Sequence, residues 1–228
     1  MQMKKLLASV VLCSAAASAH AYEAGDWIVR FGAAHVNPTG ESSTLEVERT
    51  DVVTGGRANV DSDTQLGLTG VYMMTNNLGV ELLAATPFQH GITTNSKLKG
   101  ALGGLDGLGD TKQLPPTVSL QYYFNNESIV TPYVGLGVNY TVFFGEDVDS
   151  GLEDALGGHS EMELDDSWGL AAQAGVDVAL DEHWLLNAAA WYIDIDTEAD
   201  IIAPDGTRVD VDVDIDPLVY MVGVGYQF

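Results

Sequence analysis

The sequence contains very little cysteine. Its single cysteine, Cys13, lies in an N-terminal segment with the pattern of a secretory signal, so the mature chain is predicted to contain none. A cysteine that becomes acylated follows a small residue, whereas Leu12 precedes Cys13, so a lipoprotein is not favoured. A chain without cysteine forms no disulfide and does no thiol chemistry, and a zinc site in it would need histidine and carboxylate ligands.

The first 21 residues have the three parts of a signal peptide. Two lysines form a positive start, a short apolar stretch follows, and Ala19-His20-Ala21 gives an A-x-A cleavage pattern. The apolar stretch is too short to cross a bilayer, which takes about 20 apolar residues. We therefore predict a signal peptide over residues 1–21 and one mature domain over residues 22–228, beginning at Tyr22.

Basic residues are scarce. Nine lysines and arginines stand against 33 aspartates and glutamates, a net charge of −24, and loss of the two signal lysines leaves 7 against 33, or −26. Nucleic acid is not an expected partner, because phosphate backbones are bound by basic surfaces. A negative total alone usually reflects a solvated surface, so the positions of the acids are more informative than their number.

Long apolar runs are also absent after the signal, and no segment predicts a transmembrane helix. The composition is nevertheless 46% hydrophobic with 25 glycines, which suits strands with one apolar face. Alternating segments of about ten residues, separated by turns, are typical of outer-membrane β-barrels. Eight such segments are predicted: 26–36, 64–74, 78–87, 117–124, 133–144, 167–180, 184–196 and 216–228.

The last segment alternates most clearly, with Tyr220 and Val222 on an apolar face and Met221 and Gly223 on a mixed face. A soluble β-sandwich also alternates, but the polar or very small residues of the mixed face would make a poor sandwich core. Short and long connections also alternate, as they do between the two rims of a barrel. The predicted fold class is therefore all-β, an eight-stranded antiparallel transmembrane β-barrel with short periplasmic turns and long extracellular loops. The predicted long loops are residues 37–63, 88–116, 145–166 and 197–215.

Two further patterns agree with these strands. All seven prolines lie in predicted loops or at strand ends, as expected because proline cannot donate to a β-ladder. Within the third long loop, residues 149–158 are predicted to form one or two helical turns, capped by Asp149 or Ser150 and ended by Gly157-Gly158.

Seven runs of residues stand out along the predicted barrel. They are 79–88 (GVELLAATPF), 114–117 (LPPT), 121–124 (QYYF), 132–141 (PYVGLGVNYT), 166–169 (DSWG), 191–197 (WYIDIDT) and 225–228 (GYQF). In this order the runs resemble the OmpW family of outer-membrane proteins, to which the alkane-uptake protein AlkL belongs. The resemblance implies uptake of small apolar molecules through a hydrophobic pocket or passage. It also implies insertion by the barrel assembly machinery, guided by the C-terminal aromatic residue Phe228.

Strand parity predicts which side chains line the lumen. Glu81 is expected to point inward, because a charge facing lipid costs a few kcal/mol near the bilayer midplane, and Leu83 follows on the same face. In the seventh strand the inward face is set by Asn187 and includes Trp191. Leu83 and Trp191 are also the positions that match the pocket and constriction of the family. The other predicted lining residues are Val71, Met73, Phe143, Ile193 and Met221.

Arg30, Glu81 and Asp177 are predicted to form a buried ion cluster that closes the periplasmic half of the lumen. Cargo would then leave sideways through the wall, which suits an apolar solute whose destination is the membrane. The predicted function is uptake of small hydrophobic molecules with lateral exit into the membrane. The alternative is that the inward apolar side chains, Leu83 and Trp191 among them, simply plug a narrow barrel, since an eight-stranded lumen is just wide enough for side chains to fill.

The seventh hairpin carries a row of acids. Outward parity gathers Asp194, Asp196, Asp212 and Asp214, while the inward parity of the same ribbon is apolar. The apolar side is expected to extend the hydrophobic funnel outside the membrane. The carboxylates are candidates to hold Ca²⁺ or Mg²⁺, which take oxygen ligands, and so to bridge to lipopolysaccharide phosphates. The alternative is a solvated acidic ribbon, because no compact loop with calcium-ligand spacing is present.

Two other functional classes remain open. The mature histidines, His35, His90, His159 and His183, are expected at turns, in loops or at strand ends, and no G-x-S-x-G nucleophile motif appears, so an enzyme is not expected. A structural or receptor barrel, which would stabilise the envelope through its acidic extracellular loops, is the main alternative to a channel. Outer-membrane lipid and lipopolysaccharide are expected partners under either interpretation.

Overall fold

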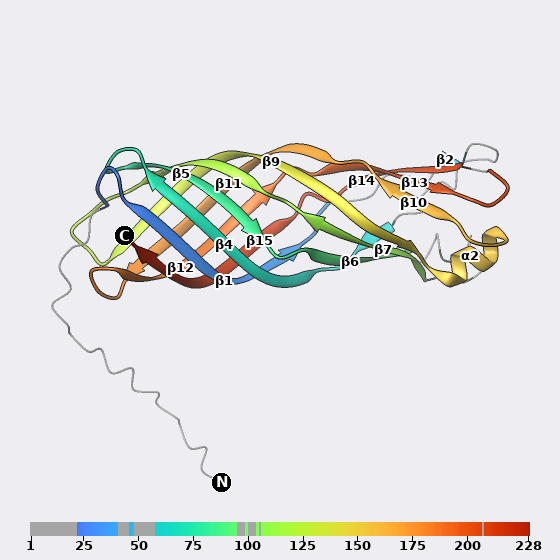
Figure 1. Ribbon diagram of the computed structural model, residues 1–228, viewed down its shortest axis with the longest axis horizontal. Coiled ribbons are helices and arrows are strands. Elements are labelled where there is room, and N and C mark those ends of the chain that lie inside the picture. Colours follow the sequence, from blue (N-terminus) through green and yellow to red (C-terminus); the bar gives the residue numbers. More distant parts are fainter. Residues whose placement is uncertain are drawn as a thin grey trace, which may run out of the picture.

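The chain forms one long antiparallel β-structure, shown in Figure 1. The computed structural model describes residues 22–40, 46–47, 58–94, 99, 104, 106–206 and 208–228. The predicted signal peptide lies outside the described residues. Within these ranges, no helix is long and apolar enough to cross a membrane.

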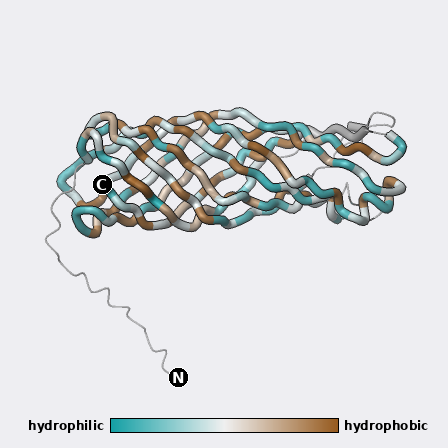
Figure 2. The backbone as a smooth tube through the Cα atoms, viewed as in Figure 1, coloured by the Kyte–Doolittle hydropathy of each residue, from teal (hydrophilic) through white to brown (hydrophobic). Residues whose placement is uncertain are grey.

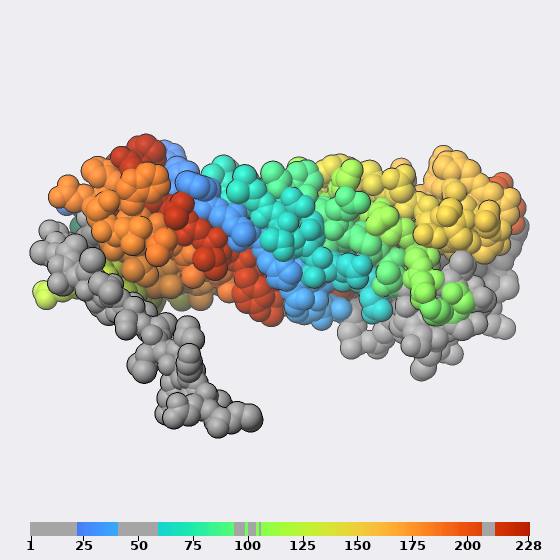
Figure 3. All heavy atoms as spheres, turned by 90° about the horizontal axis from the view of Figure 1, so that it is seen from below, coloured from blue at the N-terminus to red at the C-terminus, as the bar shows by residue number. Residues whose placement is uncertain are grey.

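Eight strands close into a barrel, which confirms the predicted fold class. In chain order they are β1 (Trp27–Asn37), β4 (Asp63–Met73), β5 (Leu78–Ala85), β8 (Thr117–Tyr123), β9 (Val130–Val148), β11 (Ser167–Ala179), β12 (Trp184–Ile193) and β15 (Leu218–Gln227). Each strand pairs with the next in this order, and β1 pairs with both β4 and β15, which closes the ring. Figure 3 shows β1, in blue, between the red β15 and the teal β4.

All eight predicted strands are present, and their bounds differ from the prediction by at most four residues. The largest difference is at β9, which begins three residues earlier and ends four residues later than the predicted segment 133–144. The seventh strand, β12, ends at Ile193 because the chain then bends into a separate ribbon. Alternation locates a strand well but is weak at its ends, where both faces are wet.

The predicted long loops are wrong in part, because much of their length is also β-structure. β6 (Phe88–Thr94) and β7 (Gly107–Leu114) form a hairpin above β5 and β8, and β7 pairs with the upper part of β9. A four-stranded sheet contains β10 (Glu161–Leu164), β13 (Asp196–Ile202), β14 (Arg208–Asp214) and β2 (Glu46–Val47), and β3 (Ala58–Val60) pairs with β6. Strands that extend beyond the barrel beside each other can continue to pair their backbone N–H and C=O groups.

These strands carry the structure well beyond a membrane. The 19 residues of β9 span about 60 Å at roughly 3.3 Å per residue, whereas about ten residues suffice to cross a bilayer. The extension lies on the right of Figure 1, at the end away from the C-terminus, with helix α2 (Ser150–Leu156) near its tip. The predicted helix is confirmed: the side chain of Asp149 accepts a hydrogen bond from the backbone N–H of Gly151 at 2.8 Å, and Gly157 ends the helix with a φ of 91°.

The outer surface of the barrel is apolar between two bands of aromatic residues. Exposed leucines and valines cover it, and Leu136 has 72% of its surface exposed. Figure 2 shows hydrophobic and hydrophilic residues alternating along these strands. Trp27 packs on Tyr72 near the short turns, and Tyr140 packs on Trp168 near the extension. Such a belt between aromatic girdles is the lipid-facing surface of an outer-membrane barrel, and the short turns mark its periplasmic end.

Candidate functional site

A buried ion cluster closes the periplasmic half of the lumen. The guanidinium of Arg30 donates to both carboxylate oxygens of Asp177, at 3.1 and 2.6 Å, and lies 3.4 Å from Glu81. Arg30 and Glu81 are fully buried, and Asp177 is 2% exposed. Two acids therefore face one arginine inside the barrel. Such charges are stable away from water only when the ion pairs have good geometry and further hydrogen bonds satisfy the remaining polar atoms.

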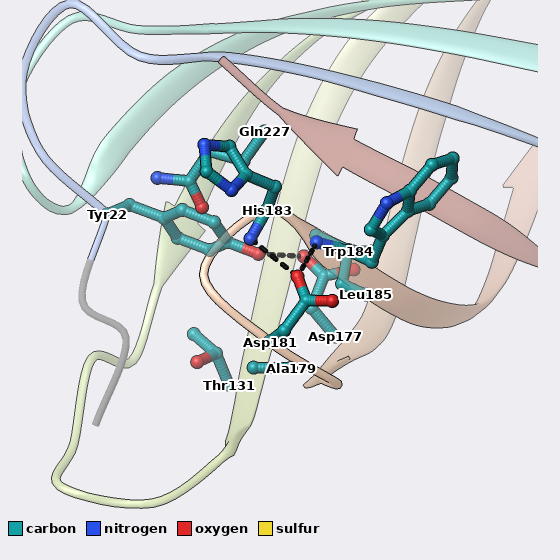
Figure 4. A pocket seen from close by; sticks show the side chains of 9 residues that line it. All are labelled: Tyr22, Thr131, Asp177, Ala179, Asp181, His183, Trp184, Leu185 and Gln227. Atoms are coloured by element: carbon teal, nitrogen blue, oxygen red, sulfur yellow. Dashed lines mark hydrogen bonds between the residues drawn. The ribbon is translucent and has the colours of Figure 1, made fainter. Parts of the chain in front are cut away.

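Three tyrosines surround the arginine. The Arg30 guanidinium lies 5.0 Å from the ring centre of Tyr133 and donates to the Tyr123 hydroxyl at 2.9 Å. The Tyr22 hydroxyl donates to Asp177 at 2.6 Å, as Figure 4 shows. Tyr133 lies against Gly175, where any Cβ would come within 2.3 Å of the ring, so only glycine leaves room for it. The site is thus filled as well as charged.

Amides extend this network across the lumen. Gln173 donates to Glu81 at 2.9 Å and accepts from Gln121 at 3.0 Å. Asn187 donates to Asp177 at 2.8 Å and to Tyr133 at 2.9 Å. The network joins β1, β5, β8, β9, β11 and β12, so it ties together six of the eight barrel strands and fills the cross-section of the lumen.

The interior above the cluster is more apolar. Trp191 extends from β12 toward Glu81, and Leu83 lies one inward position above Glu81 on β5. Both are buried, Leu83 at 5% and Trp191 at 1% exposure. Higher still, Phe143 and Ile193 are buried on the inner face. The ion cluster and its amides lie below the tryptophan, and buried apolar side chains are more frequent above it.

The structure separates two of the predicted lining residues from the others. Val71 and Met73 belong to the lower end of β4, where both lie next to Tyr123 around Gly79. Both face inward as predicted and pack beside the ion cluster, at or below the level of Glu81, so a role for them as lining residues of the upper lumen stays a prediction. Parity gives the face of a strand but not the height at which a side chain lies. Met221 lies higher, against Ala34 and Gly67.

The apolar lining continues into the extension. On its inner side Ile195, Ala199, Ile201, Val213 and Ile215 are buried. Val209 and Val211, predicted for the same face, have side chains outside the described set. The exceptions among the buried residues of this region are a few polar groups, of which His90 and Gln113 are bonded to each other at 2.9 Å. The buried side chains of the extension are therefore largely apolar.

The barrel wall is interrupted between β5 and β8. Their ladder ends at the pair Leu83–Thr117, and pairing resumes at the pair Phe88–Gln113, between β6 and β7. The intervening stretches, residues 84–87 and 114–116, make no ladder pair with each other in the described structure. We call these two stretches the proline break.

The break owes its existence to three prolines, Pro87, Pro115 and Pro116. Proline has no N–H, so it cannot donate to a neighbouring strand. The Pro116 carbonyl accepts from the N–H of Tyr140 at 3.0 Å, and Tyr140 belongs to the upper aromatic girdle. The break therefore lies near the outer boundary of the membrane-spanning belt, one step above Leu83.

A groove on the lipid-facing wall is unrelated to this break. It has a volume of about 400 Å³ and lies outside β8, β9 and β11, where Leu120, Val134, Leu136 and Ala172 line it. Because these side chains face the hydrocarbon of the bilayer, lipid chains would fill the groove in a membrane. We do not assign it to cargo.

The acidic candidates lie at the upper rim of the barrel. Asp194, Asp196 and Asp216 bring carboxylate oxygens within 4.8 Å of one another, and Asp196 pairs with Asp214 across the ribbon. Asp212 pairs with Glu198 further out, and its side chain is not among those described. A divalent cation at the acidic hairpin stays a prediction, because solvated surfaces often gather carboxylates without one.

Mild acid is expected to stabilise this ribbon. Burial, together with the carboxylates of Asp194, Asp214 and Asp216, raises the pKa of Asp196. An acid whose folded pKa exceeds its unfolded value disfavours the folded state when it is ionised, so stability should rise as the pH falls through that folded pKa. Hydrogen exchange of β13 and β14 amides, corrected for intrinsic rates, should slow as the pH is lowered from 7 toward the ordinary pKa range of aspartate. The variant Asp196→Asn should lose most of this dependence, and an equal response in both proteins would contradict the assignment.

The histidines show no catalytic arrangement in the part of the chain that the structure describes. His90 is buried inside β6, contrary to the predicted position at or beyond a strand end, and it bonds to the main-chain carbonyl of Asp61 at 2.5 Å. Burial lowers the pKa of His90. His35 bonds to Thr64, and His159 to Glu153, both on the surface. His183 stacks on Tyr226 at the periplasmic rim.

The groups that complete the base were given no role by the predictions from sequence. The base includes Tyr22, Tyr123, Gln121 and Gln173. The ring of Tyr133 packs against the guanidinium of Arg30. The available signal was parity, because each of these residues except Tyr22 has inward parity on its strand while its sequence neighbours face lipid. Tyr22 precedes the first strand, and no periodicity could have placed it.

A closed eight-stranded barrel with a lipid-facing belt, a charged base and an apolar upper lumen is an outer-membrane barrel protein. The family model described as "OmpW family" matches residues 23–228. The chain belongs to the OmpW family and is located in the outer membrane of a Gram-negative bacterium.

Relatives and solved structures agree with this assignment. Outer membrane protein W of Vibrio cholerae is 43% identical over 229 residues, covering 99% of this chain and 100% of that protein. The crystal structure of OprG from Pseudomonas aeruginosa superposes with a TM-score of 0.82 at 49% identity, covering 91% of this chain and 98% of that one. Outer membrane protein AlkL of Ectopseudomonas oleovorans is 26% identical, covering 99% of this chain and 96% of that protein.

Proposed function

We propose that this protein takes up small hydrophobic molecules from outside the cell and releases them sideways into the outer membrane. The proposal rests on the contrast between the charged lower half and the more apolar upper half of the lumen. Its lower half is filled by the Arg30–Glu81–Asp177 cluster, and its upper half is lined mainly by apolar side chains. The similarity to outer membrane protein AlkL supports the proposal, since the resemblance to this family implies uptake of small apolar molecules.

Axial passage through the base would be costly for an apolar solute. It would have to separate charged groups that are bonded to one another, and a buried charge or polar group left without a partner is strongly disfavoured. The proline break offers a different route, because it adjoins Leu83 and is not sealed by a backbone ladder. A solute that leaves there enters the hydrocarbon of the bilayer, which is favourable for apolar surface.

A charged side chain at position 83, directly above the ion cluster, tests whether cargo passes through the lumen. The variant Leu83→Arg should reduce uptake of a medium-chain alkane to the rate of cells that lack the protein, because the added guanidinium would occupy the apolar passage. The measurement is a cytoplasmic reporter response to the alkane, with equal amounts of folded protein in the outer membrane. Leu83→Met is the matched control and should keep most of the uptake, since it conserves volume and polarity. Normal uptake by Leu83→Arg would refute passage along this surface.

A second candidate function is a structural or receptor barrel. The exposed acids on the outside of the extension favour it, among them Asp196, Glu198 and Asp214. Such a surface would contact lipopolysaccharide through divalent cations or bind a cationic partner. This function predicts indifference to Leu83→Arg. It predicts instead a weaker outer-membrane barrier to detergent when the three acids are replaced by the corresponding amides.

A further inference from the structure

The carbonyl of Pro115 has an unusual partner. Continuation of the ladder beyond Leu83–Thr117 would bring Pro115 against β5, but no such pair is present among the described residues. The Thr117 hydroxyl donates to this carbonyl at 3.2 Å. A side chain two residues further along the same strand therefore satisfies an oxygen that a neighbouring strand would otherwise have to pair with.

Thr117 is itself held from the opposite side. The side-chain amide of Asn139, on β9, donates to the Thr117 hydroxyl oxygen at 3.0 Å and to the Pro116 carbonyl at 3.2 Å. Thr141 in turn donates to the amide oxygen of Asn139 at 2.7 Å. All three side chains are fully buried, so their hydrogen bonds are shielded from competing water. We call the chain Thr141–Asn139–Thr117 the brace.

The edge of the break that follows β5 is also bonded to the strand on its far side. The Thr86 hydroxyl accepts from the N–H of Leu66 at 3.2 Å and donates to Gln65 at 3.0 Å. The Thr86 N–H donates to the Leu66 carbonyl at 2.9 Å. One edge is thus bonded to β4 and the other to β9. Each edge is bonded on the side away from the break, which leaves little demand for bonds across it.

We propose that Thr117 and Asn139 are positioning residues for lateral release, because the brace keeps the Pro115 edge bonded to β9 and so keeps the proline break from closing. The inference rests on the proposed function, since it concerns the exit of the same cargo. Without the Thr117 hydroxyl, a buried carbonyl would lack a donor and would draw one from the β5 edge, because an unsatisfied buried acceptor is disfavoured. The two edges would then approach each other.

The test compares Thr117→Val with Thr117→Ser. Valine keeps the shape of threonine without the hydroxyl, whereas serine keeps the hydroxyl. Thr69→Val is the matched control, because the Thr69 hydroxyl is also buried and inward-facing but has no partner among the described groups. Alkane uptake should fall about fivefold in Thr117→Val, the factor that corresponds to about 1 kcal/mol. It should stay at the wild-type rate in Thr117→Ser and in Thr69→Val.

A distance measurement separates positioning from a general loss of stability. Spin labels at Ala84→Cys and Leu114→Cys would flank the break on its outer side, and the mature chain is predicted to contain no other cysteine. The label distance should shorten in Thr117→Val and remain at the wild-type value in Thr117→Ser and Thr69→Val. An unchanged distance, or a shorter distance with unchanged uptake, would overturn the inference.

The uptake and label-distance measurements together also distinguish this inference from the proposed function. If the wild-type protein gives no uptake above background for a panel of alkanes, the proposed function fails. The brace is then judged by the label distance alone. If uptake is present but Thr117→Val behaves as wild type in both measurements, the proposed function stands and the brace does not.

Discussion

Replacing Arg30 with methionine is expected to destabilise the folded barrel by about 3–5 kcal/mol, the usual result of removing one partner from a buried ion pair. Asp177 and Glu81 would remain buried without a cation, and the tyrosine rings around the guanidinium would lose their central contact. Urea unfolding in lipid vesicles, followed by tryptophan fluorescence and by mobility of the folded form on gels, measures the change.

The matched control removes the charges together. The triple variant Arg30→Met, Asp177→Asn and Glu81→Gln keeps the shapes of the acids and leaves no unpaired charge, so it should recover much of the lost stability. A triple variant no more stable than Arg30→Met would show that charge pairing does not explain the loss. Wild-type stability in the single variant would mean that the cluster contributes little to the barrel.

Closing the proline break with a continuous ladder is expected to abolish the uptake of apolar molecules. Pro87→Val with Pro115→Val supplies two backbone N–H groups and a residue that favours strands, so β5 and β8 should continue their ladder to β6 and β7. Uptake of a medium-chain alkane should drop to the background rate while the barrel itself remains folded. The same reporter cells and the same control for protein amount apply.

Pro132→Val serves as the control for this pair. Pro132 lies near the periplasmic end of β9 and faces outward, far along the strand from the break. Its replacement should leave uptake unchanged. Normal uptake by the sealed variant, with hydrogen exchange demonstrating protection of Ala85 and neighbouring amides, would exclude the proline break as the exit.

The barrel was predictable because lipid imposes a strict period of two. In β15 every second residue must be acceptable to hydrocarbon, and that constraint is visible in the sequence without any knowledge of partners. The same rule placed Glu81, Asp177 and Trp191 on the inner face. It carries no information about height, which explains why Val71 and Met73 were grouped with inward residues that lie above them.

The extension and the break depend on contacts that periodicity does not encode. β6 and β7 are strands because they lie beside each other and beside β9, although their sequences read as loop. The break arises where two proline-containing stretches from different hairpins come opposite each other. Each proline was expected in a loop or at a strand end, but only the register between β5 and β8 reveals that the proline-containing stretches lie opposite each other.

The position of Tyr22 has a consequence for the order of assembly. Its hydroxyl bonds to Asp177, 155 residues away, and Phe228 at the other end of the chain donates its N–H to the Trp27 carbonyl. Contacts of such long sequence separation form slowly, because a large loop must close first. Tyr22 can therefore bond to Asp177 only after β11 has taken its place in the barrel. Until then the segment around Tyr22 lacks its partner on β11, so its resistance to a protease marks the formation of this contact.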